Sequence, residues 1–202
     1  MNRLQVPLFP LHTVLYPGGP LPLRIFETRY LDMISHCLKS DTKFGVVLIR
    51  HGSETGQVAM HDTGTLANIV DWYQGSDGLL GVTAIGDKRF RVLASHCQAN
   101  GLNVGEIEII DDAEYTSLPE EFSRLAQILA DVLGDLGKLY ESLDAHYEDA
   151  GWVGYRFAEI LPIDSAQKHW CLETDDPNER LVLVRKVLKT VRGIEKNSLT
   201  PD

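Results

Sequence analysis

The chain has 202 residues, enough for one large domain or two small ones, and 44% of them are hydrophobic, so it can bury a substantial core. The net charge of -10 disfavours binding to a phosphate backbone, and the acidic residues concentrate between positions 111 and 179, where 17 Asp and Glu stand against 4 Lys and Arg. No apolar run approaches the roughly 18 residues of a membrane span, and no signal peptide is recognisable. The three cysteines are scattered and do not suggest disulfides, so we expect a cytoplasmic protein.

The first 25 residues are apolar and rich in proline. Prolines stand at positions 7, 10, 17, 20 and 22. Because proline has no backbone N–H to donate, this segment is typical of edge strands and extended connections, and Gly18-Gly19 allows a sharp reversal between two such pieces. In the charged stretch that follows, Glu27 suits the positive end of a helix dipole, and Arg24 and Arg29 can form ion pairs with it.

The next segments predict one helix and a series of strands. Apolar residues recur three and four positions apart over residues 28–39, which indicates an amphipathic helix. Short apolar runs separated by turn residues then predict strands at 44–49, 65–70, 79–85, 89–94 and 104–110. Hairpins are expected at Gly86-Asp87-Lys88 and at Asn100-Gly101. The second pair suits a tight primed turn, because Asn and Gly tolerate positive φ.

After Asp111 the apolar spacing becomes helical. Residues 117–120 match a capping box, which predicts a helix that begins there, and a second box at 176–179 predicts the start of a last helix. Three further helices are expected between them, at 139–147, 152–161 and 165–173. The sequence therefore predicts an α+β protein with a β-rich part, residues 1–115, that contains one helix and a helical part, residues 116–202, with the boundary near 111–118.

Known catalytic and ligand-binding motifs are missing from the sequence. There is no G-x-S-x-G turn, and the stretch "GDLGKL" at 134–139 fails as a phosphate loop because its glycines are too close and no Ser or Thr follows the lysine. Adjacent His-Cys pairs at 36–37 and 96–97 point apart, and the acidic cluster at 144–149 lacks the pattern of a calcium loop. We therefore expect no catalytic residue, no metal and no cofactor.

Four aromatic residues are the candidates for a binding surface. Trp72 and Tyr73 precede the turn sequence "QGSDG", where a ring can meet a ligand, and Trp152 and Tyr155 are three positions apart, so they share one helix face. The alternative is that these rings belong to the core. Burial statistics favour this interpretation for Trp72 and Tyr73, as aromatics at a strand end that cover the core, and favour it slightly for Trp152 and Tyr155.

An ordered series of sequence blocks resembles a known family. The blocks are "PLFPLHTVLYPGGPLPLRIFETRYLDM", "FGVVLI", "GTLANIVDW", "DGLLGVTAIGDKRFRVL", "WVGYRFAEILPID", "CLETDD" and "ERL". They cover about residues 4–191 and look like the substrate-binding N-terminal domain of the Lon protease, in its free-standing bacterial form. The family usually has proline where Thr28 stands, and Thr28 is expected to replace it as a helix cap.

The resemblance implies a PUA-like β-barrel or pseudo-barrel followed by a helical bundle. It also implies binding of unfolded or tagged polypeptide without catalysis, because the ATPase and Ser-Lys peptidase modules of the full protease are missing from this sequence. Such a module would serve as an adaptor, a holdase or a regulator of proteolysis, with a protease or chaperone as partner. RNA binding, which PUA-like folds support, is the alternative, and the acidic charge counts against it. A small-molecule enzyme ranks third.

Overall fold

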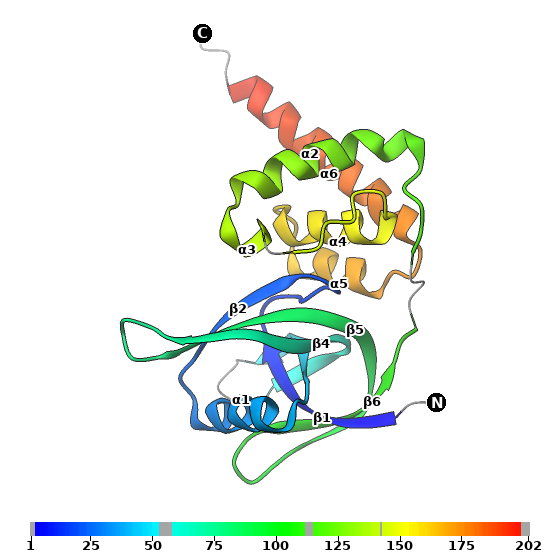
Figure 1. Cartoon of the computed structure of the whole chain (residues 1–202). Helices are drawn as coiled ribbons and strands as arrows, with labels where there is room; N and C mark the ends of the chain where they lie inside the picture. The colour runs from blue at the N-terminus through cyan, green and yellow to red at the C-terminus, as the bar shows by residue number, and fades with distance from the viewer. Residues whose placement is uncertain (1–2, 53–57, 112–114, 142, 199–202) are drawn as a thin grey trace. The chain divides into compact units, whose positions relative to one another are not determined.

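The computed structural model describes residues 3–52, 58–111, 115–141 and 143–198, with side chains as far as Val191. The chain divides into two compact units, Met1–Asp112 and Ala113–Asp202 (Figure 1). The first unit contains strands and one helix and the second contains helices, so the α+β class predicted from the sequence is confirmed. Residues 112–114 of the expected boundary region lie outside the described residues, and the predicted division at 115/116 stays a prediction.

The first unit is built around a six-stranded mixed sheet. The strands are β1 (Arg3–Leu11), β2 (Pro20–Ile25), β3 (Phe44–Gly52), β4 (Val58–Gln74), β5 (Leu80–Cys97) and β6 (Asn103–Ile109). Their order is β2-β5-β4-β3-β1-β6, and β5 also pairs with β6, so five of the strands close into a ring. β2 and β6 share one side of β5, where β2 pairs with its first part and β6 with its last part.

Strand β1 connects the ring through two different ladders. It pairs with β6 from Arg3 to Leu8 and in parallel with β3 from Leu8 to Leu11, so Leu8 alone takes part in both registers. Pro7 and Pro10 therefore each lie where β1 has a partner on one side only, which is where a residue without an N–H is tolerated. The expectation of an edge strand holds for β2, which pairs with β5 alone among the described strands.

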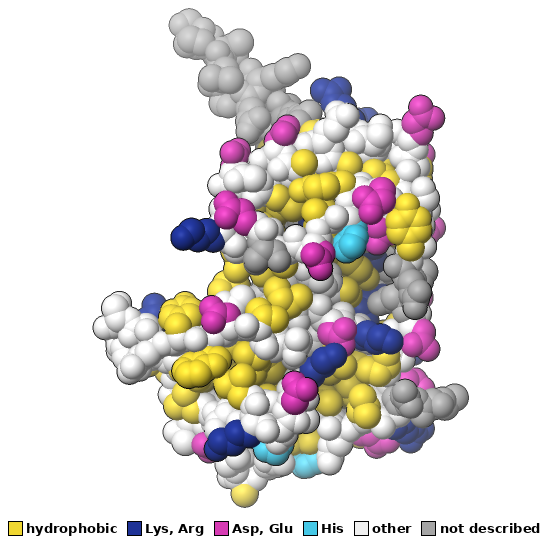
Figure 2. Space-filling view, in the orientation of Figure 1, with side chains coloured by type: hydrophobic (Ala, Val, Ile, Leu, Met, Phe, Trp, Pro, Cys, Tyr) yellow, Lys and Arg dark blue, Asp and Glu magenta, His cyan; other side chains and the backbone are white. Residues whose placement is uncertain are grey.

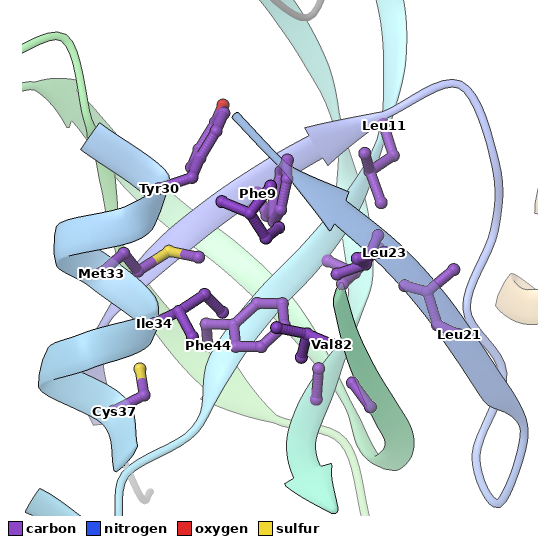
Figure 3. Packing of buried hydrophobic residues seen from close by; sticks show 14 of the residues in the cluster. Phe9, Leu11, Leu21, Leu23, Tyr30, Met33, Ile34, Cys37, Phe44 and Val82 are labelled. Carbon is purple, nitrogen blue, oxygen red and sulfur yellow. The ribbon is translucent and has the colours of Figure 1, made fainter. Parts of the chain in front are cut away.

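Helix α1 (Thr28–Ser40) covers the main hydrophobic core of the first unit. Figure 3 shows Met33, Ile34 and Cys37 pointing from α1 toward the strands, where Phe9 and Phe44 lie. These side chains are almost fully buried, and each such aliphatic or aromatic side chain stabilises the fold by about 1.5–3 kcal/mol relative to exposure. The predicted helix is confirmed, but its cap is not: Glu27 is the N-cap residue, Thr28 is the first helical residue, and no side chain caps the helix.

The hairpin expected at residues 86–88 is wrong, because β5 runs through these positions as one strand. Gly86 forms two backbone hydrogen bonds with the turn between β1 and β2. Gly18 N donates to the Gly86 carbonyl (2.7 Å), and Gly86 N donates to the Gly19 carbonyl (2.9 Å). A methyl group at position 86 would overlap the Tyr16 carbonyl oxygen, so glycine is required by a close approach rather than by a reversal. The hairpin at 98–102 is confirmed, but only Gly101 has a positive φ, so its turn is not the primed type.

The second unit consists of helices around α4. They are a short 3-10 turn η1 (Glu120–Phe122), then α2 (Ser123–Asp135), α3 (Lys138–Glu141), α4 (Ala150–Ile160), α5 (Ser165–Glu173) and α6 (Pro177–Ser198). Eight of the 11 residues of α4 are buried, as expected of a helix packed against α2, α5 and α6. The predicted helix at 165–173 is confirmed, whereas the one at 139–147 is wrong in extent, because α3 ends at Glu141.

The first predicted capping box is also wrong, for a physical reason that the structure shows. Ser117 pairs with Asp149 in an isolated antiparallel bridge, and Asp149 caps α4 by accepting a hydrogen bond from Gly151 N (3.0 Å). At the second box, Asp176 does cap α6, since its carboxylate accepts from Asn178 N (2.8 Å).

Candidate functional site

The candidate site is the end of the first unit formed by β2 and the β4–β5 hairpin, which projects at the left of Figure 1. Along the three strands, directly opposite residues form rows that alternate between the two faces of the sheet. One row is Tyr73, Gly81 and Arg24, and the neighbouring row is Trp72, Val82 and Leu23. Val82 and Leu23 belong to the core, so Trp72 lies on the core side of these strands and Tyr73 lies on the opposite side.

Exposed hydrophobic side chains gather at this end of the unit. Trp72 is 61% exposed, Tyr73 51% and Phe26, which follows β2, 62%. Val70 is also exposed, at an irregularity of the β4–β5 register between residues 69 and 71. Figure 2 shows hydrophobic side chains on both sides of the projecting hairpin. Exposed rings that are held by a sheet lose little conformational entropy on binding, so this end of the unit is suited to contact with apolar ligands.

One pocket on this surface, here called the hairpin pocket, has a volume of about 230 Å³. It is lined by Arg24, Tyr73, Gly75, Ser76, Asp77, Leu79 and Gly81. The Tyr73 ring lines it and lies over Gly81, where an added methyl group would overlap the ring. Arg24 of β2 forms an ion pair with Asp77 of the hairpin turn, and both residues line the pocket.

The second pocket, here called the aromatic pocket, has a volume of about 180 Å³. It is lined by Phe9, Leu11, Pro22, Leu23, Arg24, Ile25, Phe26, Glu27 and Tyr30. Figure 3 shows the Phe9 and Tyr30 rings side by side, and their centroids are 3.9 Å apart in a stacked arrangement. The pocket therefore presents an aromatic wall beside the edge strand β2, with Arg24 common to both pockets.

The charged residues around the aromatic pocket differ in part from the expectation. Arg29 does pair with Glu27 (2.9 Å), and it also donates to the Gly101 carbonyl (2.6 Å) and lies over the Tyr30 ring. This side chain thus fastens the start of α1 to the β5–β6 hairpin. Arg24, expected to pair with Glu27, pairs instead with Asp77, because its side chain points to the opposite face of β2 from the core.

The structure separates the four aromatic candidates into two pairs. Trp72 and Tyr73 are exposed at the candidate site, whereas Trp152 and Tyr155 are buried in the second unit, each 8% exposed. Trp152 packs edge-on against Tyr147 at 5.1 Å, and Tyr155 lies under the Arg180 guanidinium at 3.8 Å. The burial of this second pair agrees with the core interpretation, and a part for these two rings in binding stays a prediction.

Phe26 and the Arg24–Asp77 pair were not recognised in the sequence as parts of a site. Phe26 stands in "RIFET" between a strand and a helix, and a single apolar residue in a sequence does not by itself indicate an exposed position. The ion pair joins positions far apart in the chain, so its only sequence signal is the charge of each residue.

Buried charge occurs in the second unit, in a cluster of α3, α4 and α5. Burial raises the pKa of Glu159 to about 7. The positive charges of Arg156 and Lys168 and the hydrogen bonds from Arg156 and Tyr140 lower this pKa, but their effect is smaller than that of burial. Arg156 donates to the Glu159 carboxylate at 2.7 Å.

Among the described residues, no three His, Cys, Asp or Glu side chains gather as a metal would require. Within the same residues, no helix combines the length and apolar character needed to cross a bilayer.

Comparison with known proteins places this architecture in a family. The model of the ATP-dependent protease La (LON) substrate-binding domain matches residues 5–190, and the chain belongs to this family. It therefore carries a substrate-binding module of the Lon type, as the sequence blocks predicted.

Individual relatives agree with this assignment. The crystal structure of a Lon N-terminal domain protein from Xanthomonas campestris is 37% identical, with a TM-score of 0.75 over 91% of this chain and 98% of that one. The Lon protease of Anaeromyxobacter dehalogenans is 25% identical over 96% of this chain. A LON peptidase N-terminal domain and RING finger protein of Schizosaccharomyces pombe is 27% identical over 89%. The chain spans 24% of the length of the Anaeromyxobacter dehalogenans protein and 44% of the length of the Schizosaccharomyces pombe protein.

Proposed function

We propose that this chain binds unfolded or tagged polypeptide through the exposed surface of β2 and the β4–β5 hairpin, and that it does so without catalysing a reaction. The observation that carries the proposal is the group of exposed rings, Phe26, Trp72 and Tyr73, beside two pockets on one sheet end. Unfolded chains differ from folded proteins in the apolar side chains that they expose, and a rigid apolar surface is what recognises them.

The cellular role that fits such a module is that of an adaptor, a holdase or a regulator of proteolysis in a bacterial cytoplasm. Its partners would be the unfolded client and a protease or chaperone that receives it. The same proposal includes a PUA-like pseudo-barrel for the first unit and a helical bundle for the second. The RNA-binding alternative gains no support from the family match, and a net charge of -10 opposes it.

Fluorescence anisotropy with labelled, chemically unfolded casein tests the proposal. We expect binding that is insensitive to salt, because apolar contact drives it, and no binding to single-stranded RNA. Trp72→Ala and Tyr73→Ala should each weaken binding by about 1–3 kcal/mol. Trp170→Ala is the matched control, since Trp170 is also exposed but belongs to the second unit. Equal affinity for all these variants would contradict the proposed surface.

A further inference from the structure

We infer that the polypeptide segments bound at this surface combine a bulky apolar residue with a basic residue, the first in the aromatic pocket and the second on Asp77, where it replaces Arg24. The inference rests on the proposed function and adds a sequence preference to it.

Arg24 stands between the two pockets and can leave its position at little cost. It lines both of them, and its side chain is 66% exposed. An ion pair in such an exposed position contributes little to stability. Among the described residues, the Arg24 guanidinium forms its ion pair with Asp77 alone. A cation brought by a ligand can therefore take its place on Asp77.

Asp77, in contrast, is fixed by the turn that carries it. Its Oδ1 accepts a hydrogen bond from Leu79 N (3.2 Å), and the turn is closed by Gly75 N donating to the Leu79 carbonyl (2.8 Å) and by Gly78 N donating to the Gly75 carbonyl (2.9 Å). The second oxygen, Oδ2, faces the hairpin pocket and Arg24. The carboxylate thus stays in place when its partner changes.

The surroundings of Asp77 also favour a positive charge. The Tyr73 ring lies beside it in the same pocket, and the face of an aromatic ring attracts cations. Charge complementarity therefore points to a Lys or Arg of the bound segment and not to an Asp or Glu.

The geometry of β2 sets the spacing of the two residues. β2 is an edge strand, but Pro20 and Pro22 offer no N–H to a neighbouring chain, so a segment beside it gains most of its affinity from side chains. Leu23 and Ile25, which line the aromatic pocket, point to the face opposite to Arg24. In an extended segment successive side chains also alternate, so the basic residue is expected an odd number of positions from the apolar one.

The test uses the full chain and labelled, otherwise neutral peptides in a binding titration. One peptide carries Phe followed directly by Lys, a second carries Phe followed by Glu, and a third has Lys two positions after Phe. We expect the first to bind about tenfold tighter than the second and more tightly than the third. Arg24→Ala, which exposes Asp77, should strengthen binding of the first peptide about three- to tenfold. Asp77→Asn should remove the difference between Lys and Glu.

Asp87→Asn is the matched control, because Asp87 has the same 37% exposure as Asp77 and pairs with Lys43 away from both pockets. It should leave the preference for Lys unchanged, and circular dichroism should show equal folding of all variants. Equal binding of the peptides, or a preference that survives Asp77→Asn, would overturn the inference. If unfolded casein still binds and depends on Trp72 in that case, the proposed function stands; loss of casein binding as well would overturn both.

Discussion

Two tryptophans of opposite burial provide a direct test of where the binding surface lies. Trp72 is 61% exposed and Trp152 is 8% exposed. If a tryptophan can bury about 250 Å², Trp72 buries roughly 100 Å² and Trp152 roughly 230 Å². At about 25 cal/mol per Å² these areas correspond to about 2.5 and 6 kcal/mol, and both are upper bounds because the denatured chain already buries some of this surface.

We therefore expect Trp72→Ala to lower the free energy of unfolding by about 1–2 kcal/mol and Trp152→Ala to lower it by about 3–5 kcal/mol, because only the second leaves a cavity. Affinity for unfolded casein should show the opposite order, with a loss for Trp72→Ala and none for a folded Trp152→Ala. Urea unfolding followed by circular dichroism and anisotropy measure the two quantities. A large stability loss with normal casein binding for Trp72→Ala would refute the reasoning and place Trp72 in the core.

Two further predictions concern stability in the second unit. Because the pKa of Glu159 is raised to about 7 from 4.5, its protonated form contributes stability that is fully present below about pH 4.5 and is lost as the pH rises through 7. Between these pH values the free energy of unfolding of the native protein should fall by up to about 3 kcal/mol, and Glu159→Gln should remove this fall. An unchanged slope in the variant would count against the raised pKa. Asp164→Ala, which removes the capping box of α5, should cost about 1 kcal/mol in urea unfolding, whereas Ser117→Ala should change stability by less than about 0.5 kcal/mol. Equal losses for the two variants would restore Ser117 as a cap.

The sequence predicted elements well where one local pattern decides the structure. Tyr30, Met33 and Cys37 fall on one helix face whatever surrounds them, and α1 is found where they indicate it. The reversal expected at Gly86 failed because a glycine can serve a turn or a close backbone contact, and the contact with Tyr16 comes from a segment about 70 positions earlier. Ser117 failed for the same reason, since its bridge to Asp149 is not local.

The candidate site was predictable in part. The turn that follows Trp72 and Tyr73 makes them candidates for a binding surface, and both are exposed, whereas their part in binding stays a prediction. The spacing of Trp152 and Tyr155 correctly implied a shared helix face, but spacing does not tell which side of a helix meets the core. The pairing of Arg24 with Asp77 depends on the register of β2 with β5, which no property of either segment alone determines.

The two ladders of β1 have a consequence for the order in which the chain folds. Arg3 pairs with Glu108, so the ring closes only when the first and last strands of the unit meet. Such distant contacts carry a large loop-closure entropy and slow the folding of a domain. During synthesis β1 has no β6 to pair with until nearly all of the unit has been made. We therefore expect the first unit to close late, after residue 109 has left the ribosome, while the local contacts of helices such as α1 form early.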